Sequence, residues 1–155
     1  MIESKIETIF VKRLKCRLEK LNIQVVGTWD VGSLTENKGE EDAGATGVLV
    51  VKISPRQYAT PTVPDMTLNG ALSLSVRGEI DFDGTVYLEA VSQILEEMEM
   101  LQKCYHDTHM EYSLPDEGFE VVGFQLGQGD NNINPTSKIY SYTHPFSVMG
   151  VITNP

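Results

Sequence analysis

Apolar residues recur every three or four positions in two segments of the chain. In residues 2–21 the repeat consists of Ile2, Ile6, Ile9, Phe10, Leu14, Leu18 and Leu21. In residues 85–104 it consists of Tyr87, Val91, Ile94, Leu95, Met98 and Leu101. This spacing places the apolar side chains of each segment along one side of a helix. The pattern therefore predicts two amphipathic helices, the first stopping at Asn22 and the second capped by Asp83 or Thr85.

Other segments have the alternating or continuous apolar pattern of strands. Residues 70–82 alternate most clearly, and their expected inward side chains are Leu72, Leu74, Val76, Ile80 and Phe82. Such alternation is typical of a strand with one buried face. Shorter apolar stretches predict four more strands, at 23–29, 48–53 and 119–126 and in a segment beginning at Ser137.

The order of these elements is helix, weak strand, two strands, helix and hairpin. We therefore expect an α+β fold, a mostly antiparallel sheet with two helices packed on one face. A length of 155 residues is typical of a single domain, here residues 1–155. Residues 105–117 are interpreted as a polar connector. Three glycine- or proline-rich segments without periodicity are predicted to be long loops, 32–47, 54–69 and 127–136.

Charge is distributed unevenly along the chain, whose formal net charge is −10. Residues 1–22 contain six Lys or Arg and three Glu, 6 − 3 = +3, and the rest of the chain carries 6 − 19 = −13. Residues with this much negative charge repel the phosphate backbones of nucleic acids, and we therefore expect no specific nucleic-acid binding. The basic helix is instead predicted to dock on an acidic surface, such as that of a neighbouring copy, through Lys12, Arg13, Lys15 and Arg17.

No apolar run approaches the ~20 residues that span a bilayer, and no segment resembles a signal peptide. We therefore expect no membrane partner and a cytosolic location.

Residues with catalytic or metal-binding chemistry form no convincing pattern. Cys104, His106 and His109 are close in sequence, and thiolate and imidazole are common zinc ligands. Their spacing matches no standard zinc motif, however, and a solvated helix end explains them equally well. Strand alternation places Ser147 and His144 on opposite faces. Because no helix follows Gly127-x-Gly129, this pair is interpreted as part of a hairpin tip. The sequence therefore predicts a protein that is not an enzyme and that has no cofactor or metal.

The order of elements resembles that of the tail terminator proteins and related neck, or tail-completion, proteins of long-tailed bacteriophages. The most similar passage is Leu72-Ser-Leu-Ser-Val-Arg-Gly-Glu-Ile-Asp-Phe-Asp-Gly, which leads from a strand into the second helix. The matching segments are Ile2–Leu21, Gly47–Ile53 with Gly70–Phe82, Thr85–Cys104 and Phe119–Ile152. The likeness is one of pattern, because this family has no diagnostic short motif.

The resemblance implies a structural virion protein that forms a hexameric ring, caps the tail tube and meets the head connector. It also implies a location in the host-cell cytoplasm during assembly, and then in the virion. The alternative hypothesis is a small metal-binding or enzymatic domain that uses Cys104, His106 and His109.

Overall fold

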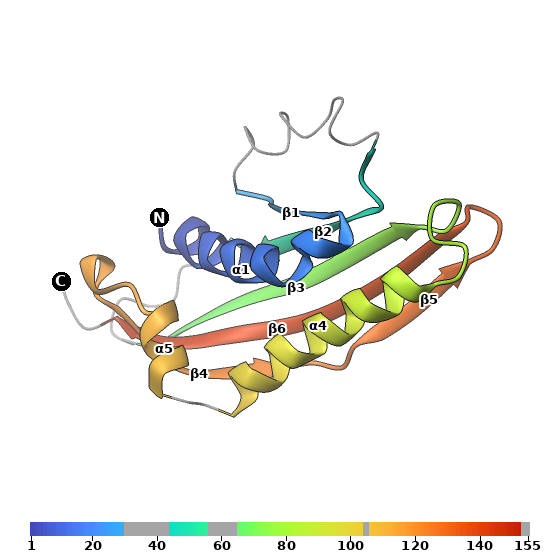
Figure 1. The fold of residues 1–155 in the computed structure, drawn as a ribbon. Coiled ribbons are helices and arrows are strands. Elements are labelled where there is room, and N and C mark those ends of the chain that lie inside the picture. Colours follow the sequence, from blue (N-terminus) through green and yellow to red (C-terminus); the bar gives the residue numbers. More distant parts are fainter. Residues whose placement is uncertain (30–43, 56–64, 104–105, 153–155) are drawn as a thin grey trace.

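A computed structural model describes residues 1–29, 44–55, 65–103 and 106–152 of the chain. Figure 1 shows an elongated sheet with helices packed against it. Within the described residues the sheet has six strands, and five of them follow the spatial order β1-β2-β3-β6-β4. The sixth, β5, pairs with β6 on the same edge as β4. The strands are β1 (Ile23–Gly27), β2 (Gly47–Ile53), β3 (Asp65–Arg77), β4 (Phe119–Leu126), β5 (Asp130–Asn134) and β6 (Ile139–Ile152).

Among the described strands, β1 and β2 pair in parallel and the other pairs are antiparallel. The long strand β6 organises the sheet. One of its sides pairs with β3 along all 13 residues of that strand, from Asp65 opposite Val151 to Arg77 opposite Ile139. Its other side pairs with β4 and then with β5, so these two short strands share one edge. The predicted mostly antiparallel sheet is thus confirmed.

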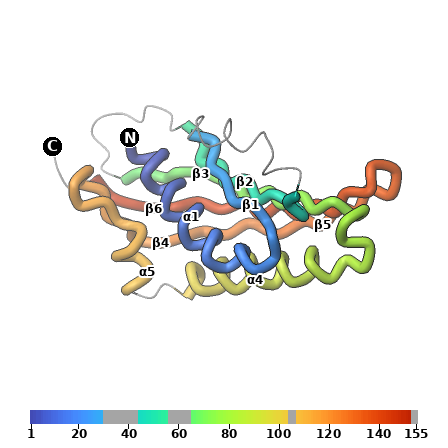
Figure 2. Tube along the Cα trace, turned by 45° about the horizontal axis from the view of Figure 1, so that its top comes forward, coloured from blue at the N-terminus to red at the C-terminus, as the bar shows by residue number. Residues whose placement is uncertain are grey.

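Helices α1 (Ile2–Leu18) and α4 (Thr85–Gln102) lie on the same side of this sheet (Figure 2). Helix α1 contacts β1 and β2, whereas α4 contacts β4. A 3₁₀ turn, Glu19–Leu21, extends α1 to Asn22, whose left-handed backbone (φ 56°) ends it as the sequence predicts. The predicted α+β fold with two helices on one face is confirmed.

A further short helix occupies the segment that the sequence analysis interprets as a polar connector. Helix α5 (His106–Tyr112) is followed by a 3₁₀ turn, Pro115–Glu117. Its last residue, Tyr112, is fully buried, with its ring 4.7 Å from that of Phe10 and 5.3 Å from that of Phe124. The connector interpretation is therefore wrong. Seven residues with one deeply buried aromatic are too few to show helical periodicity.

The core lies between the helices and the sheet. Along β3, the side chains of Leu68, Leu72, Leu74 and Val76 are buried, whereas Ser73 and Ser75 between them are exposed. The helix-facing side of β3 is therefore apolar, and its opposite side is polar and solvated.

The strand predicted over residues 70–82 ends earlier than expected. Strand β3 ends at Arg77, and residues after Gly78 turn towards α4. Beyond Arg77 the chain forms a turn, because the carbonyl of Arg77 accepts hydrogen bonds from the N–H groups of Ile80 (3.1 Å) and Asp81 (3.0 Å). Ile80 and Phe82, expected to point inward, are exposed, and Phe82 retains 80% of its accessible surface.

The start of α4 is capped by a different residue from those predicted. The buried carboxylate of Asp81 accepts hydrogen bonds from the N–H groups of Val86 (3.2 Å) and Tyr87 (2.8 Å). The N-cap position itself is Gly84, in a left-handed conformation (φ 71°). Asp81 thus satisfies N–H groups that the helix leaves unpaired, as a capping residue does.

Two of the predicted loops contain strand residues. The segment 54–69 includes the first five residues of β3, and 127–136 includes all of β5. Most of the remaining predicted loop, 32–47, lies outside the described residues. Its last residue, Gly47, begins β2. Among the described residues, no helix is long and apolar enough to cross a membrane.

Candidate interaction surfaces

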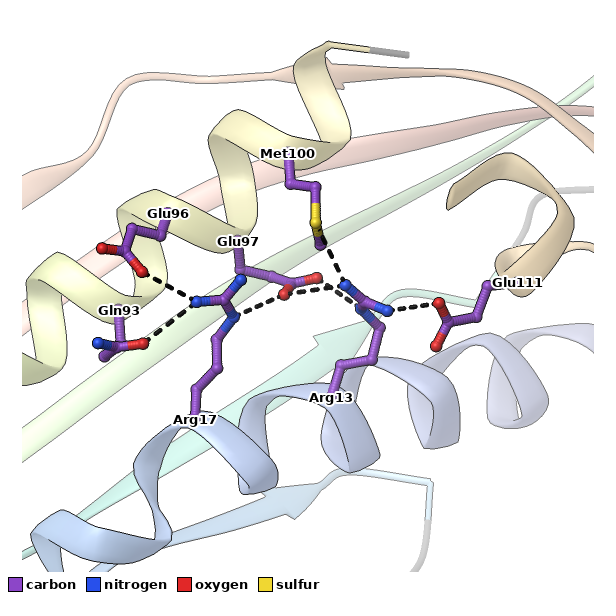
Figure 3. A network of polar contacts seen from close by, with 7 residues as sticks. All are labelled: Arg13, Arg17, Gln93, Glu96, Glu97, Met100 and Glu111. Atoms are coloured by element: carbon purple, nitrogen blue, oxygen red, sulfur yellow. Dashed lines mark hydrogen bonds and ion pairs between the residues drawn. The ribbon is translucent and has the colours of Figure 1, made fainter. Parts of the chain in front are cut away.

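Helices α1 and α4 are joined by a buried carboxylate (Figure 3). The side chain of Glu97 on α4 is only 1% exposed. Its Oε2 accepts a hydrogen bond from Arg13 Nε at 2.7 Å, and its Oε1 accepts one from Arg17 Nε at 2.8 Å. Two guanidinium groups from successive turns of α1 therefore neutralise one carboxylate on α4.

The two arginines also bind other groups around Glu97. Arg13 forms an ion pair with Glu111 on α5, and Arg17 bonds to Glu96 and Gln93, each at 3.1 Å. Burial opposes the charge on Arg13, but its bonds to Glu97 and Glu111 outweigh that effect and raise the pKa of its guanidinium. These contacts tie α1, α4 and α5 into one layer.

The four predicted interface residues fall into two groups. Arg13 and Arg17 are engaged in the contacts with Glu97, whereas Lys12 and Lys15 are exposed on the neighbouring side of α1. Within the described part of the chain, neither lysine forms an ion pair. A contact of any of the four with another chain stays a prediction.

The outer surfaces of α1 and α4 differ in charge. Helix α1 carries five Lys or Arg and two Glu, 5 − 2 = +3, and both glutamates, Glu3 and Glu7, are buried. Helix α4 carries four Glu and no Lys or Arg, and only Glu97 among these is buried. The solvated side of α1 is therefore basic and that of α4 is acidic.

Several large apolar side chains on and near α4 are exposed. Leu95, which the sequence pattern assigns to the core, is 46% exposed, and Leu88 is exposed as well. Ile80 and Phe82 precede the helix. Ile133 on β5 is also exposed, and β5 lies beside the first turn of α4, since the hydroxyl of Tyr87 donates a hydrogen bond to Asn131. Sequence reasoning missed this surface because an apolar residue in a periodic pattern signals burial, whether in a core or in an interface.

The candidate metal ligands are only partly described. His109 lies on α5, half-buried, with its ring 5.8 Å from that of Phe124. Cys104 and the side chain of His106 lie outside the described residues. Among the residues that are described, no three His, Cys, Asp or Glu side chains gather into a metal site. The structure therefore adds no support for these three residues as ligands.

Strand β6 carries a buried polar pair. The Tyr142 hydroxyl lies 2.8 Å from Nδ1 of His144, and both side chains are buried. Burial lowers the pKa of His144, although a contact with the backbone of Gly127 acts in the opposite direction. Ser147 lies on the other face, where its hydroxyl donates a hydrogen bond to Asn69 (2.8 Å). The sequence-based separation of Ser147 from His144 is thus confirmed.

The described part of the open sheet face contains a shallow depression with a volume of about 380 Å³. It crosses β3, β6 and the end of β4, and its lining includes Asn69, Gln125, Pro145 and Ser147. Its lining carries no acid, base or thiol. It provides amide and hydroxyl groups for binding and no obvious group for proton transfer.

Gly127 and Gly129 lie where the neighbouring side chains leave no room for a Cβ atom. A Cβ at Gly129 would lie 2.0 Å from the hydroxyl oxygen of Tyr142, and one at Gly127 would lie 2.5 Å from Pro145. Strand β5 follows directly, so the segment leads into a strand as expected and does not have the strand-turn-helix order of a dinucleotide loop.

Comparison of the chain with protein-family models and with curated proteins finds no match.

Proposed function

We propose that this chain is a structural virion protein of a phage or prophage. It acts as a tail terminator-like ring that caps the tail tube and joins it to the head connector. Its element order supports this: α1, paired strands, a long strand leading into α4, and a final set of antiparallel strands. This is the order on which the resemblance to tail terminator and neck proteins rests.

The observation that carries the proposal is the opposite charge of two helices on one molecule. The solvated side of α1 is basic, and that of α4 is acidic with exposed leucines beside the charges. Two complementary, non-identical surfaces favour a head-to-tail contact between copies, and such contacts close into rings when the rotation permits. A hexameric ring is the form that the resemblance implies.

A structural role also fits the strongly negative net charge of the chain. DNA must pass through a tail without binding to its wall, and an acidic wall gives phosphates no cationic partners. The ring's partners are tail-tube and head-connector proteins, and DNA passes through its lumen without specific recognition. Assembly takes place in the host-cell cytoplasm, and the ring then remains in the virion. In this role the chain is not an enzyme.

Deletion of the gene in induced cells tests the proposal. We expect intact, DNA-filled heads together with tails of uncontrolled length or tails that fail to join heads, as seen by electron microscopy. Supplying the wild-type chain from a plasmid should restore infectious particles. Normal infectious particles without the gene would overturn the proposal. Loss of an enzymatic product would favour the metal-binding or enzymatic alternative.

A further inference from the structure

The side of α4 that faces away from α1 is an unusual helix surface. Leu88, Ser92, Leu95 and Glu99 follow one another at spacings of four, three and four residues, so they form one stripe. All four side chains are exposed. Gln93, Glu96, Glu97 and Met100 form the other flank, which binds the arginines of α1 (Figure 3). Among the described residues, this second flank is the side of α4 that binds α1.

Helix α1 has a complementary stripe. Lys5, Thr8, Lys12 and Lys15 are spaced by three, four and three residues and are all exposed. Lys5 is paired with Glu117, whereas Lys12 and Lys15 have no ion pair to a described residue. A lysine has a long aliphatic stem and a charged tip, so it can cover a leucine while its ammonium group reaches a carboxylate.

We propose that the Leu88–Glu99 stripe of α4 binds the Lys12–Lys15 stripe of α1 from a second copy of this chain. This inference rests on the proposed function, because it names the contact that would link neighbours in the ring. The lysine stems cover Leu88 and Leu95, and an ammonium group binds the carboxylate of Glu99, which within one chain pairs with Lys103 (3.3 Å). The same pairing of basic α1 with acidic α4 already exists within one chain, where Arg13 and Arg17 bind Glu97.

The geometry of one chain allows this contact to propagate. Helix α1 lies over β1 and β2, at one edge of the sheet, and α4 lies towards β4, at the other (Figure 2). The two stripes lie on different helices, so one copy can donate its α1 stripe while its α4 stripe receives that of the next. This heterologous arrangement suits a closed ring.

Disulfide trapping tests the contact directly. Cys16 is exposed on α1 beside Lys12 and Lys15, and Ser92 lies at the centre of the α4 stripe. In the full-length Ser92→Cys variant, concentrated and oxidised, we expect links between Cys16 of one chain and residue 92 of another. Isotope-labelled and unlabelled chains are mixed, so that mass spectrometry identifies links between chains. Ser73→Cys, on the open face of the sheet, is the matched control. A yield of links no higher than in this control would overturn the proposal.

Charge exchange provides the second test. Lys12→Glu with Lys15→Glu should reduce the inter-chain links at least tenfold, and adding Glu99→Lys should restore a substantial part. No reduction, or a reduction that Glu99→Lys does not relieve, would count against the contact. If the lysine variant instead loses retention on duplex DNA while its links persist, the stripe is a nucleic-acid surface and the proposal fails. Because trapping uses purified chains, it is independent of the deletion phenotype. Links without a tail defect would contradict only the virion role.

Discussion

The carboxylate of Glu7, on α1, accepts a hydrogen bond from the backbone N–H of Ile53, the last residue of β2 (3.0 Å). The same carboxylate accepts bonds from the N–H of Trp29 (2.7 Å) and the hydroxyl of Thr28 (3.0 Å), just after β1. Glu7 is buried, so these donors replace the water that an exposed carboxylate would bind. One helix side chain thus satisfies backbone groups at the ends of two parallel strands.

Replacing Glu7 by glutamine should destabilise the protein by about 2–3 kcal/mol, because an amide N–H₂ group would then face buried donors. The free energy of unfolding, measured by urea titration, checks this. Glu19→Gln, an exposed position next to the same helix, should change it by less than about 0.5 kcal/mol. Equal effects of the two substitutions would mean that the bonds of Glu7 contribute little.

Gly27 leaves room for this carboxylate. A Cβ at position 27 would lie 2.3 Å from Oε1 of Glu7, so Gly27→Ala must displace the carboxylate from its donors. We expect a loss of about 1–3 kcal/mol in urea unfolding. Gly44→Ala, where a Cβ would meet no atom within 4 Å, is the matched control and should be nearly neutral. A stable Gly27→Ala variant would show that Glu7 can shift at no cost.

Removing the carboxylate of Glu97 should also be costly. Glu97→Ala leaves Arg13 and Arg17 partly buried without their shared partner, and loss of one member of a buried ion pair costs about 3–5 kcal/mol. Thermal or urea unfolding measures the loss. Glu89→Ala, on the solvated side of the same helix, should have little effect. A Glu97→Ala variant as stable as wild type would contradict the assigned role.

An aspartate should have different effects on folding at two neighbouring positions of α4. Ile94→Asp places an unpaired carboxylate in the core and should prevent folding. Leu95→Asp falls on the exposed stripe and should leave the free energy of unfolding within about 1 kcal/mol of wild type. Circular dichroism and urea titration distinguish them. Unfolding by Leu95→Asp would place that side chain in the core after all.

The buried His144 should make stability depend on pH. Burial lowers its folded-state pKa below the ordinary value of 6.5, so the unfolded chain binds the proton first as the pH falls. Its neutral form is favoured in the fold. The contribution of His144 to stability should therefore be complete above pH 6.5 and should decrease as the pH falls below it. Urea unfolding at pH 7.5 and 5.5 measures this difference.

His144→Asn should reduce that pH dependence. Asparagine keeps a polar group near the Tyr142 hydroxyl but cannot titrate in this range. A difference between pH 7.5 and 5.5 that is unchanged in His144→Asn would assign the effect to other groups.

The sequence predicts elements well where one residue type repeats along one face. Residues 2–21 and the alternation from Leu72 to Val76 gave correct elements because every apolar position there meets the same core. Prediction from the sequence fails where a tertiary contact determines whether an element forms. Strand β5 has five exposed, mostly polar residues, and it exists because β6 extends beyond β4 and provides pairing groups for it. No local pattern reveals such pairing.

The candidate surfaces were only partly predictable for a related reason. The basic character of α1 is visible in the sequence, but the pairing of Arg13 and Arg17 with Glu97 joins residues about 80 positions apart. The selection of Asp81 over Asp83 as the cap depends on where β3 stops pairing. Leu95 has the spacing of a core residue, but the repeat alone does not show that this position, at the edge of the apolar stripe, stays exposed.

Strand β6 is the last of the described strands to be synthesised. Strand β6 pairs with β3, β4 and β5, so residues from Asp65 onwards have no complete sheet until Ile152 has left the ribosome. Until then the apolar faces of β3 and β4 lack their neighbour, and unpaired strand edges of this kind are prone to aggregation. The sheet therefore forms only after β6 has been made, and its sequence-distant strand pairs slow that step.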